Sequence, residues 1–243
     1  MAQNEKVPRL PWWPAPADRA PVREPLSRGQ IVAAAIRVAD AEGGAALSMR
    51  RLAQELGAGT TSLYRHVSNK DELLDLALDQ VLGEVRADDD PAKSWQDRAG
   101  ALIRAFRDVL RRHPGIAPLI DTRVTRGPQA LALGDRLLGI LRAAGFAGIE
   151  LGLAYQILLR WGSAFGAIDA RETGRPLAEG HSGVQQEALI DEMLAGLPRD
   201  VYPNIVITFD YAHELTSDAQ FESGLRVILT GLAGELAAGG LEG

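Results

Sequence analysis

The 243-residue sequence predicts an all-α protein, built from a small N-terminal helical domain and a larger C-terminal helical domain. Apolar residues recur at the three- and four-residue spacing of amphipathic helices along most of the chain. Residues that favour helix N-caps and C-terminal turns flank these stretches. Residues 205–209 are rich in β-branched side chains, but no partner strand is evident elsewhere, so we expect this segment to be helical or irregular.

Residues 1–26 are expected to form a Pro-rich, disordered arm. Six prolines stand in this stretch, and their spacing leaves no room for a helix or a central strand. Trp12 and Trp13 are unusual in such a segment, and the sequence assigns them no role.

Residues 27–86 are predicted to form the N-terminal domain. Ser27 and Gln30 have the spacing of a capping box, and Gly43 suits the turn that ends a helix. Similar signals delimit three further helices, with Ser48 and Asn69 as N-caps. The four predicted helices run from Ser27 to Gly43 and over residues 49–56, 60–67 and 70–86.

Residues 92–238 are predicted to form the C-terminal domain. Three aspartates and a proline at 88–91 separate it from the first domain. Pro128 suits the first turn of a helix, and Ser217 is the expected N-cap of the last helix, in a second capping box. The predicted elements cover residues 94–112, a short turn at 116–120, and residues 128–144, 149–172, 184–195 and 217–238.

Charge is unevenly distributed along the chain, whose formal net charge is -6. Residues 1–70 carry 10 Lys and Arg against 6 Asp and Glu, whereas the remainder carries 16 against 26. An acidic body repels nucleic-acid phosphates and restricts contact with them to the basic front. Such asymmetry is common among soluble proteins, so by itself it indicates a nucleic-acid partner only weakly.

The chain contains no cysteine, which excludes disulfides, zinc fingers of the Cys type and thiol catalysis. No segment reaches the ~20 apolar residues that a membrane helix needs, and no secretory signal is visible at the N-terminus. We therefore expect a cytoplasmic protein with no membrane partner.

The most informative unit spans residues 48–67. Two short predicted helices meet across a glycine-containing turn, which is the helix-turn-helix arrangement. Leu52, Ala53 and Leu56 form the inward face of the first helix. Leu63 and Val67, four residues apart, anchor the second helix inward.

The remaining side chains of this unit face outward and suit the major groove of DNA. Residues 60–62 are short donors and acceptors that fit base edges. Tyr64 suits a phosphate, Arg65 a phosphate or a guanine, and Arg50 and Lys70 flank the groove as phosphate clamps. A solvated helix with a core-packed tyrosine is the alternative. The candidate DNA-binding residues are Ser48, Arg50, Thr60, Thr61, Ser62, Tyr64, Arg65, His66 and Lys70.

Residues 31–85 resemble the DNA-binding domain of TetR-type regulators. The resemblance implies that Arg50, the triplet 60–62, Tyr64, His66 and Lys70 lie against DNA. It also implies an all-helical, roughly Ω-shaped homodimer. Members of that family mostly repress transcription, and they release DNA when a small molecule enters the helical body. The segments that carry the resemblance include Asp40-Ala41-Glu42-Gly43, Leu47-Ser48-Met49-Arg50-Arg51-Leu52-Ala53, Ser62-Leu63-Tyr64-Arg65-His66-Val67 and Asn69-Lys70-Asp71-Glu72-Leu73-Leu74.

The C-terminal part is more loosely similar to the tetracycline-repressor-like subgroup, over residues 113–119, from 127 onward, at 202–203 and over 220–225. Small residues line one face of its long helix and of its last helix, which permits short distances between helices. The resemblance places these helices in a four-helix dimer bundle, and packing within one subunit is the alternative. The candidate dimer-interface residues are Leu159, Ser163, Gly166, Gly224, Val227 and Gly231.

Aromatic and apolar residues of the C-terminal domain suit a pocket for a small apolar or aromatic molecule, because ligand pockets are mostly apolar with few polar anchors. An ordinary core or surface position is the alternative for each of them. No cofactor and no metal site is predicted, since the histidines are scattered; a metal-linked ligand contact through His113 is the weaker alternative. The candidate ligand-binding residues are Phe106, Leu110, His113, Tyr155, Leu158, Trp161 and Phe165.

The sequence therefore predicts a ligand-responsive, DNA-binding transcriptional regulator. We expect a homodimeric repressor that a small apolar or aromatic molecule releases from a palindromic double-stranded operator. An enzyme is not expected, because the chain lacks a nucleophile with a base beside it and a Gly-rich phosphate loop. An all-helical enzyme and a structural DNA binder that responds to no ligand are the alternatives. For the arm, with Arg9, Arg19 and Arg23, a minor-groove contact is the alternative to a solvated tail.

Overall fold

The computed structural model describes residues 26–173, 192, 196–209 and 214–239. Every regular element in these ranges is a helix, which confirms the all-α prediction, and residues 205–209 are helical rather than irregular. The Pro-rich arm with Trp12 and Trp13, and nearly all of the helix expected over 184–195, lie outside the described residues. The helices are α1 (Arg28–Glu42), α2 (Met49–Glu55), α3 (Thr60–Tyr64), α4 (Lys70–Leu82), α5 (Trp95–Arg112), the 3₁₀ helix η1 (Ala117–Leu119), α6 (Pro128–Ala144), α7 (Gly148–Thr173), α9 (Pro203–Phe209) and α10 (Ser217–Ala237).

Side chains at the N-caps explain where the helices of the N-terminal part begin. Ser27 and Gln30 form the predicted capping box: the Ser27 hydroxyl accepts from the Gln30 N–H, and the Gln30 amide oxygen accepts from the Ser27 N–H at 2.9 Å. Ser48 and Asn69 cap α2 and α4 by accepting from N–H groups three residues on, at 3.1 and 2.8 Å. These contacts confirm the predicted starts.

Two helices are shorter than predicted. α3 was expected to continue through residues 65–67, but these residues form a turn instead. The N–H groups of His66 and Val67 both donate to the carbonyl of Leu63. This tightens the chain into a turn that a regular helix does not continue. α4 also ends a turn early, at its C-cap Gly83.

The sequence predicts Ser217 as the N-cap of α10, but the N-cap in the structure is Thr216. The Thr216 hydroxyl accepts from the Ala219 N–H at 3.2 Å. The Ser217 hydroxyl donates to the carboxylate of Asp169 and accepts from the guanidinium of Arg107. Charged groups of two other helices therefore set the orientation of Ser217, and the preceding residue takes the capping role.

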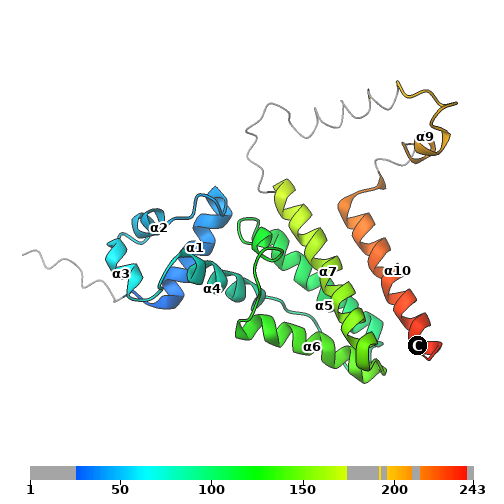
Figure 1. Cartoon of the computed structure of the whole chain (residues 1–243), viewed down its shortest axis with the longest axis horizontal. Coiled ribbons are helices and arrows are strands. Elements are labelled where there is room, and N and C mark those ends of the chain that lie inside the picture. Colours follow the sequence, from blue (N-terminus) through cyan, green and yellow to red (C-terminus); the bar gives the residue numbers. More distant parts are fainter. Residues whose placement is uncertain (1–25, 174–191, 193–195, 210–213, 240–243) are drawn as a thin grey trace, which may run out of the picture.

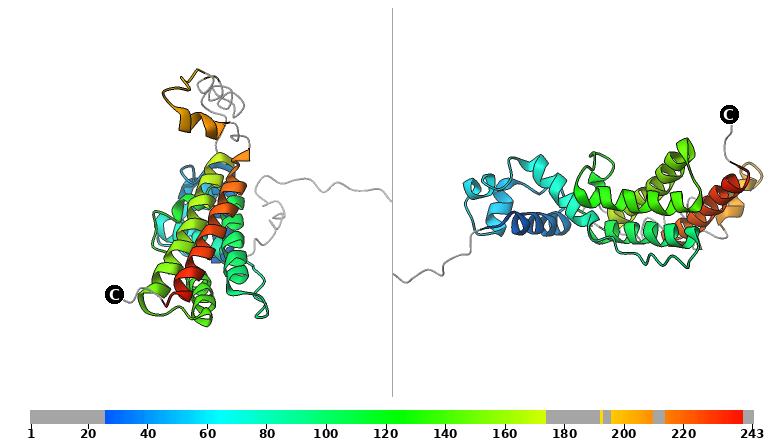
Figure 2. Two further views of the ribbon diagram at one scale, coloured as in Figure 1. Left: turned by 90° about the vertical axis from the view of Figure 1, so that its right-hand side faces the viewer. Right: turned by 90° about the horizontal axis from the view of Figure 1, so that it is seen from below.

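The helices fall into two groups, which we call the head (α1–α4) and the body (α5, α6, α7 and α10) (Figure 1). The head lies at one end of an elongated molecule, as the right-hand view in Figure 2 also shows. α5 and α7 pack along each other through the body, and α6 and α10 pack beside them. α4 contacts α1 within the head and both α5 and α6 of the body, so it joins the two groups. None of the helices in the described ranges has the length and apolar character of a membrane span.

Apolar burial stabilises both groups, since each fully buried large aliphatic side chain contributes roughly 1.5–3 kcal/mol. α5 and α7 approach closely because two residues of α7 lack a side chain: a Cβ atom on Gly162 would lie 2.9 Å from Phe106, and one on Gly166 would lie 2.6 Å from Leu110. Among the largest fully buried side chains are Leu47, Leu52, Leu63, Leu73 and Leu78 in the head, and Leu102, Ile103, Leu110, Leu137 and Phe221 in the body.

Candidate nucleic-acid interface

α2, α3 and the turn between them form a helix-turn-helix in the head. Gly57 has the left-handed φ of 58° that glycine favours, and the Ala58 N–H donates to the Ala53 carbonyl at 2.9 Å. The chain thus reverses tightly after α2 and brings α3 across it. Of the side chains predicted to hold the two helices together, Leu52, Ala53, Leu63 and Val67 are buried, whereas Leu56 is half-buried.

The outward side chains of this unit are accessible. Tyr64 exposes 52% of its surface although it is a large aromatic residue, so the alternative of a core-packed tyrosine is wrong. Its neighbours on the predicted DNA-binding surface fall into two sets. Ser48, Arg50, Thr60, Thr61 and Arg65 are exposed, and Ser62, His66 and Lys70 are half-buried.

Acidic side chains close to this surface are paired with other groups. Arg51 donates to Glu42 at 2.9 Å and to Glu55 at 3.0 Å, and these hydrogen bonds raise the pKa of Arg51. Glu72 accepts from the backbone N–H of Ser68 at 2.6 Å, which lowers the pKa of Glu72. The negative charges beside the helix-turn-helix are therefore largely compensated within the head.

The basic side chains of Arg50, Arg65 and Lys70 behave differently, because none has an ion-pair or hydrogen-bond partner within the described part of the chain. Their charges are available to an external anion. They flank the short polar residues 60–62, which can donate to and accept from base edges. A surface that binds DNA needs cations for the phosphates and short polar side chains for the bases, and this surface offers both.

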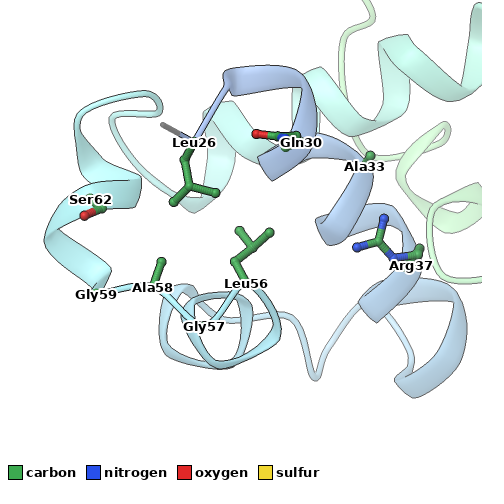
Figure 3. A pocket seen from close by; sticks show the side chains of 9 residues that line it. All are labelled: Leu26, Gln30, Ala33, Arg37, Leu56, Gly57, Ala58, Gly59 and Ser62. Carbon is green, nitrogen blue, oxygen red and sulfur yellow. The ribbon is translucent and has the colours of Figure 1, made fainter. Parts of the chain in front are cut away.

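A hollow lies beside this surface, between α1 and the turn that joins α2 to α3 (Figure 3). Sequence analysis did not identify it, because its two walls are brought together only by the packing of α1 on the helix-turn-helix. Ser62 lines the hollow and also belongs to the predicted DNA-binding set. The lining residues are Leu26, Gln30, Ala33, Arg37, Leu56, Gly57, Ala58, Gly59 and Ser62.

α5 and α7 bring most of the predicted ligand-binding residues together in the body. The ring centroids of Trp161 and Phe165 are 4.8 Å apart, and those of Phe165 and Phe221 are 5.5 Å apart. Other hollows in the described surface lie elsewhere, between α5 and α10 and beside α4. The ligand site thus stays a prediction. Of its residues, Phe106, Leu110 and Leu158 are buried, and Tyr155, Trp161 and Phe165 are half-buried.

A buried ion pair, which sequence analysis missed, lies beside these rings. Arg107 and Asp169 expose only 4% and 5% of their surfaces, and Arg107 Nε donates to Asp169 Oδ2 at 2.7 Å. The guanidinium also lies 4.3 Å from the ring centroid of Phe221. The sequence contains one signal for the burial of Arg107, since this residue falls on the same helical face as the apolar residues Ile103 and Leu110.

His113 lies away from the aromatic cluster, where the end of α5 meets the head. Its Nδ1 is 2.7 Å from Asp40 of α1, and its Nε2 is 3.1 Å from Glu84, which follows α4. The hydrogen bond with Asp40, and then that with Glu84, raise the pKa of His113 against the opposing effect of burial. Both ring nitrogens of His113 are thus engaged by carboxylates at the junction of head and body, and its assignment to the ligand site stays a prediction.

Two of the predicted dimer-interface residues pack inside the subunit. A Cβ atom on Gly224 would lie 2.0 Å from Trp161, and one on Gly166 would lie 2.6 Å from Leu110. Their small size therefore serves contacts between α10 and α7 and between α7 and α5, which favours the alternative of packing within one subunit at these two positions; the dimer interface itself stays a prediction. Of the others, Val227 and Gly231 are exposed, and Leu159 and Ser163 are half-buried.

Comparison with known proteins agrees with this architecture. The family model described as bacterial regulatory proteins of the tetR family matches residues 31–77, and that described as the tetracyclin repressor-like C-terminal domain matches residues 88–236. An HTH-type transcriptional regulator of Saccharopolyspora erythraea is 35% identical over 98% of this chain and 96% of its own length.

Solved structures are similar over most of the chain. Apo ActR from Streptomyces coelicolor has a TM-score of 0.77 at 34% identity, covering 88% of this chain and 98% of its own. ActR in complex with actinorhodin has a TM-score of 0.76 at the same identity, covering 86% and 98%. BioQ with its natural double-stranded DNA operator has a TM-score of 0.54 at 28% identity, covering 70% and 99%. The matched family consists of regulators rather than enzymes, and this chain belongs to it as a TetR-family helix-turn-helix transcriptional regulator.

Proposed function

We propose that this protein is a homodimeric repressor that binds a palindromic operator and leaves it when a small apolar or aromatic molecule binds the body. The surface of the helix-turn-helix carries the proposal: Arg50, Arg65 and Lys70 have no ion-pair partner among the described residues, while Arg51 binds the neighbouring Glu42 and Glu55. A chain with net charge -6 thereby keeps a locally cationic surface at the place where DNA is recognised.

Each residue of this surface has a proposed role. Residues 60–62 read base edges, because their side chains are short and polar. Arg50, Tyr64 and Lys70 bind phosphates and fix the orientation of α3 in the groove. Ser48 positions Arg50 by capping α2. Arg65 and His66 contact the operator beside this set.

An exposed apolar face supports the dimer. TetR-family regulators are dimers, and on α7 the side chains of Ile149, Leu153 and Ile157 repeat every four residues and are exposed, Ile149 by 71%. On the neighbouring α10, Val227 is exposed by 65%. Apolar side chains in such a row are expected to be covered in the assembled protein. We place the dimer contact there, together with Leu159, Ser163 and Gly231.

An effector site in the body is supported by the half-buried rings of Trp161 and Phe165, which offer stacking faces to an aromatic molecule. The similarity to ActR, which was solved with actinorhodin, favours a ligand of the same broad class. α4 contacts both groups of helices, so a shift of α5 or α6 would reach the head through it. An effector then weakens operator binding by its differential affinity for the two arrangements.

We further propose that residues 27–86 and 92–238 are the two functional domains, the first reading DNA and the second sensing the effector. The site of action is the cytoplasm, since that is where a bacterial chromosome is accessible.

The decisive experiment is a salt titration of operator binding by fluorescence anisotropy, with DNA from the region upstream of the protein's own gene. A dimer that contacts phosphates through Arg50 should lose about two units of the slope of log K against log salt when Arg50 is replaced by Ala. Arg142→Ala is the matched control, because it removes the same charge from an exposed position at the end of α6. Equal slopes for the two variants, or no salt-sensitive specific complex, would contradict the proposal.

A further inference from the structure

We propose that Asp40, Glu84 and His113 form a proton-dependent latch that fixes the orientation of the head on the body and thereby sets operator affinity. This inference rests on the proposed function, because operator binding is the property that the latch adjusts. It assigns a coupling role to Asp40 and Glu84, which belong to neither predicted site, and to His113, which sequence analysis had placed among the ligand-binding residues.

The latch joins three separate elements. Asp40 is near the end of α1, Glu84 follows α4, and His113 is the C-cap of α5. The imidazole bridges the two carboxylates, with Nδ1 2.7 Å from Asp40 and Nε2 3.1 Å from Glu84. Asp40 also accepts from the backbone N–H of Gly115 at 3.1 Å. One carboxylate of the head therefore binds both the imidazole of His113 and the main chain two residues after it.

The main chains at this point lie in direct contact. A Cβ atom on Gly115 would lie 2.0 Å from the carbonyl oxygen of Ala39, and one on Gly44 would lie 2.6 Å from the carbonyl oxygen of Gly115. No side chain separates the turn after α5 from the end of α1. A tilt of the head relative to the body must therefore displace the groups of the latch, and cannot be absorbed by a flexible side chain between them.

The bridge requires a cation at its centre. A protonated imidazole donates through both nitrogens, whereas the neutral ring has one N–H and leaves one carboxylate facing a lone pair. Within the described ranges, Arg112 also faces the latch and donates to Glu84 at 2.9 Å. Burial opposes ionisation of Glu84, but hydrogen bonds from His113 and Arg112 lower its pKa. Glu84 thus stays ionised near neutral pH, and His113 is the group of the latch whose proton we expect to be lost.

The sign of the pH dependence follows from the direction of the pKa shift. The latch raises the pKa of His113, so its stabilising effect is complete below about pH 6.5, where a free histidine is protonated too. The effect is lost as the pH rises through the raised pKa. Two heads must present their recognition helices about one DNA turn apart, and a fixed head loses less freedom on binding. We therefore expect operator affinity to fall as His113 loses its proton.

The test compares the full-length protein with His113→Gln in operator binding from about pH 6 to about pH 9 at constant ionic strength. The wild-type affinity should fall several-fold across this range, whereas the variant should bind more weakly at low pH and show a nearly flat profile. Lys93→Gln is the control, because it removes an exposed cation paired with Asp88, next to the start of α5 and far from the latch at its end; its profile should follow that of the wild type. Equal slopes for wild type and His113→Gln would overturn the proposal.

A histidine NMR titration without DNA separates the two proposals. The pKa of His113 should lie above that of a free histidine in the wild type and should return toward it in Asp40→Asn, which also serves if His113→Gln does not fold. An ordinary pKa for His113 in the wild type would refute the latch. A raised pKa together with the absence of any specific operator complex would instead refute the proposed function and, with it, the effect of the latch on DNA binding.

Discussion

Asp79 caps a helix other than its own, and removing its carboxylate should destabilise the contact between head and body. α6 begins after Gly127, which has no side chain with which to cap it. Asp79 of α4 supplies the missing acceptor, since its Oδ1 accepts from the N–H groups of Gln129 at 3.0 Å and Ala130 at 2.9 Å. A Cβ atom on Gly127 would lie 2.1 Å from the carboxyl carbon of Asp79, so the carboxylate occupies the space of a local capping side chain.

Replacing a capping Asp by Ala typically costs about 0.5–2 kcal/mol, and an acidic group at a helix N-terminus contributes about 0.3–1 kcal/mol through the helix dipole. The two effects overlap, because the same carboxylate provides both. We expect Asp79→Ala to lower the free energy of unfolding by roughly 1–2 kcal/mol, equivalent to a decrease in Tm of roughly 2–8 °C. Asp79→Asn keeps an acceptor oxygen and removes only the charge. We expect it to lower the free energy of unfolding by less than half as much as Asp79→Ala does.

Urea denaturation followed by circular dichroism measures these changes, at one protein concentration because the stability of a dimer depends on it. Asp75→Ala is the matched control: Asp75 lies one turn earlier in α4 and forms an exposed ion pair with Arg123. Such pairs contribute about 0–1 kcal/mol, so this variant should change little. If Asp75→Ala destabilises the protein as much as Asp79→Ala, or if Asp79→Asn loses as much as Asp79→Ala, the capping argument is wrong.

Two further predictions concern the interior of the body. Gly224→Ala should lower the free energy of unfolding by roughly 1–3 kcal/mol, because its methyl group would lie 2.0 Å from Trp161. Gly139→Ala, with open space around it in α6, should be neutral or stabilise the protein by up to ~1 kcal/mol, and equal urea midpoints for the two variants would count against this packing. Arg107→Met should destabilise by roughly 3–5 kcal/mol, because it removes the guanidinium that neutralises the buried carboxylate of Asp169. Adding Asp169→Asn should recover part of that loss in a thermal melt, and no recovery would argue against the ion pair.

Local signals were sufficient for most of the helices. The capping box at Ser27 and the N-caps Ser48 and Asn69 each act through hydrogen bonds over three residues, so they are visible without the fold. Pro128 and Gly145 delimit α6 for a similar reason, since their backbone preferences are intrinsic.

The start of α10 shows where such local reasoning fails. Both Thr216 and Ser217 are suitable N-caps, and their local propensities do not decide between them. The hydroxyl of Ser217 is taken by Asp169 and Arg107, which lie far away in the sequence.

The nucleic-acid interface was accessible to sequence analysis because it is contained in one short segment. Leu63 and Val67 are four residues apart, so their burial fixes which neighbouring side chains of α3 face outward. The sequence does not show that Arg51 is paired whereas Arg50 has no partner in the part of the chain that the structure describes. That difference depends on where Glu42 lies after α1 and α2 have packed.

The sequence by itself determined that this protein is all-helical, where most of its helices begin and end, and that a helix-turn-helix presents polar and basic residues outward. Only the tertiary structure decided the partner that each small or charged residue of the body meets. It packed Gly166 and Gly224 against side chains of the same subunit, paired Arg107 with Asp169, and brought His113 against Asp40 at the junction of head and body. The physical reason is the distance along the sequence between the residues that interact. Caps and helical faces arise from residues within one or two turns, whereas these contacts depend on how the helices cross, which the packing of the whole core sets.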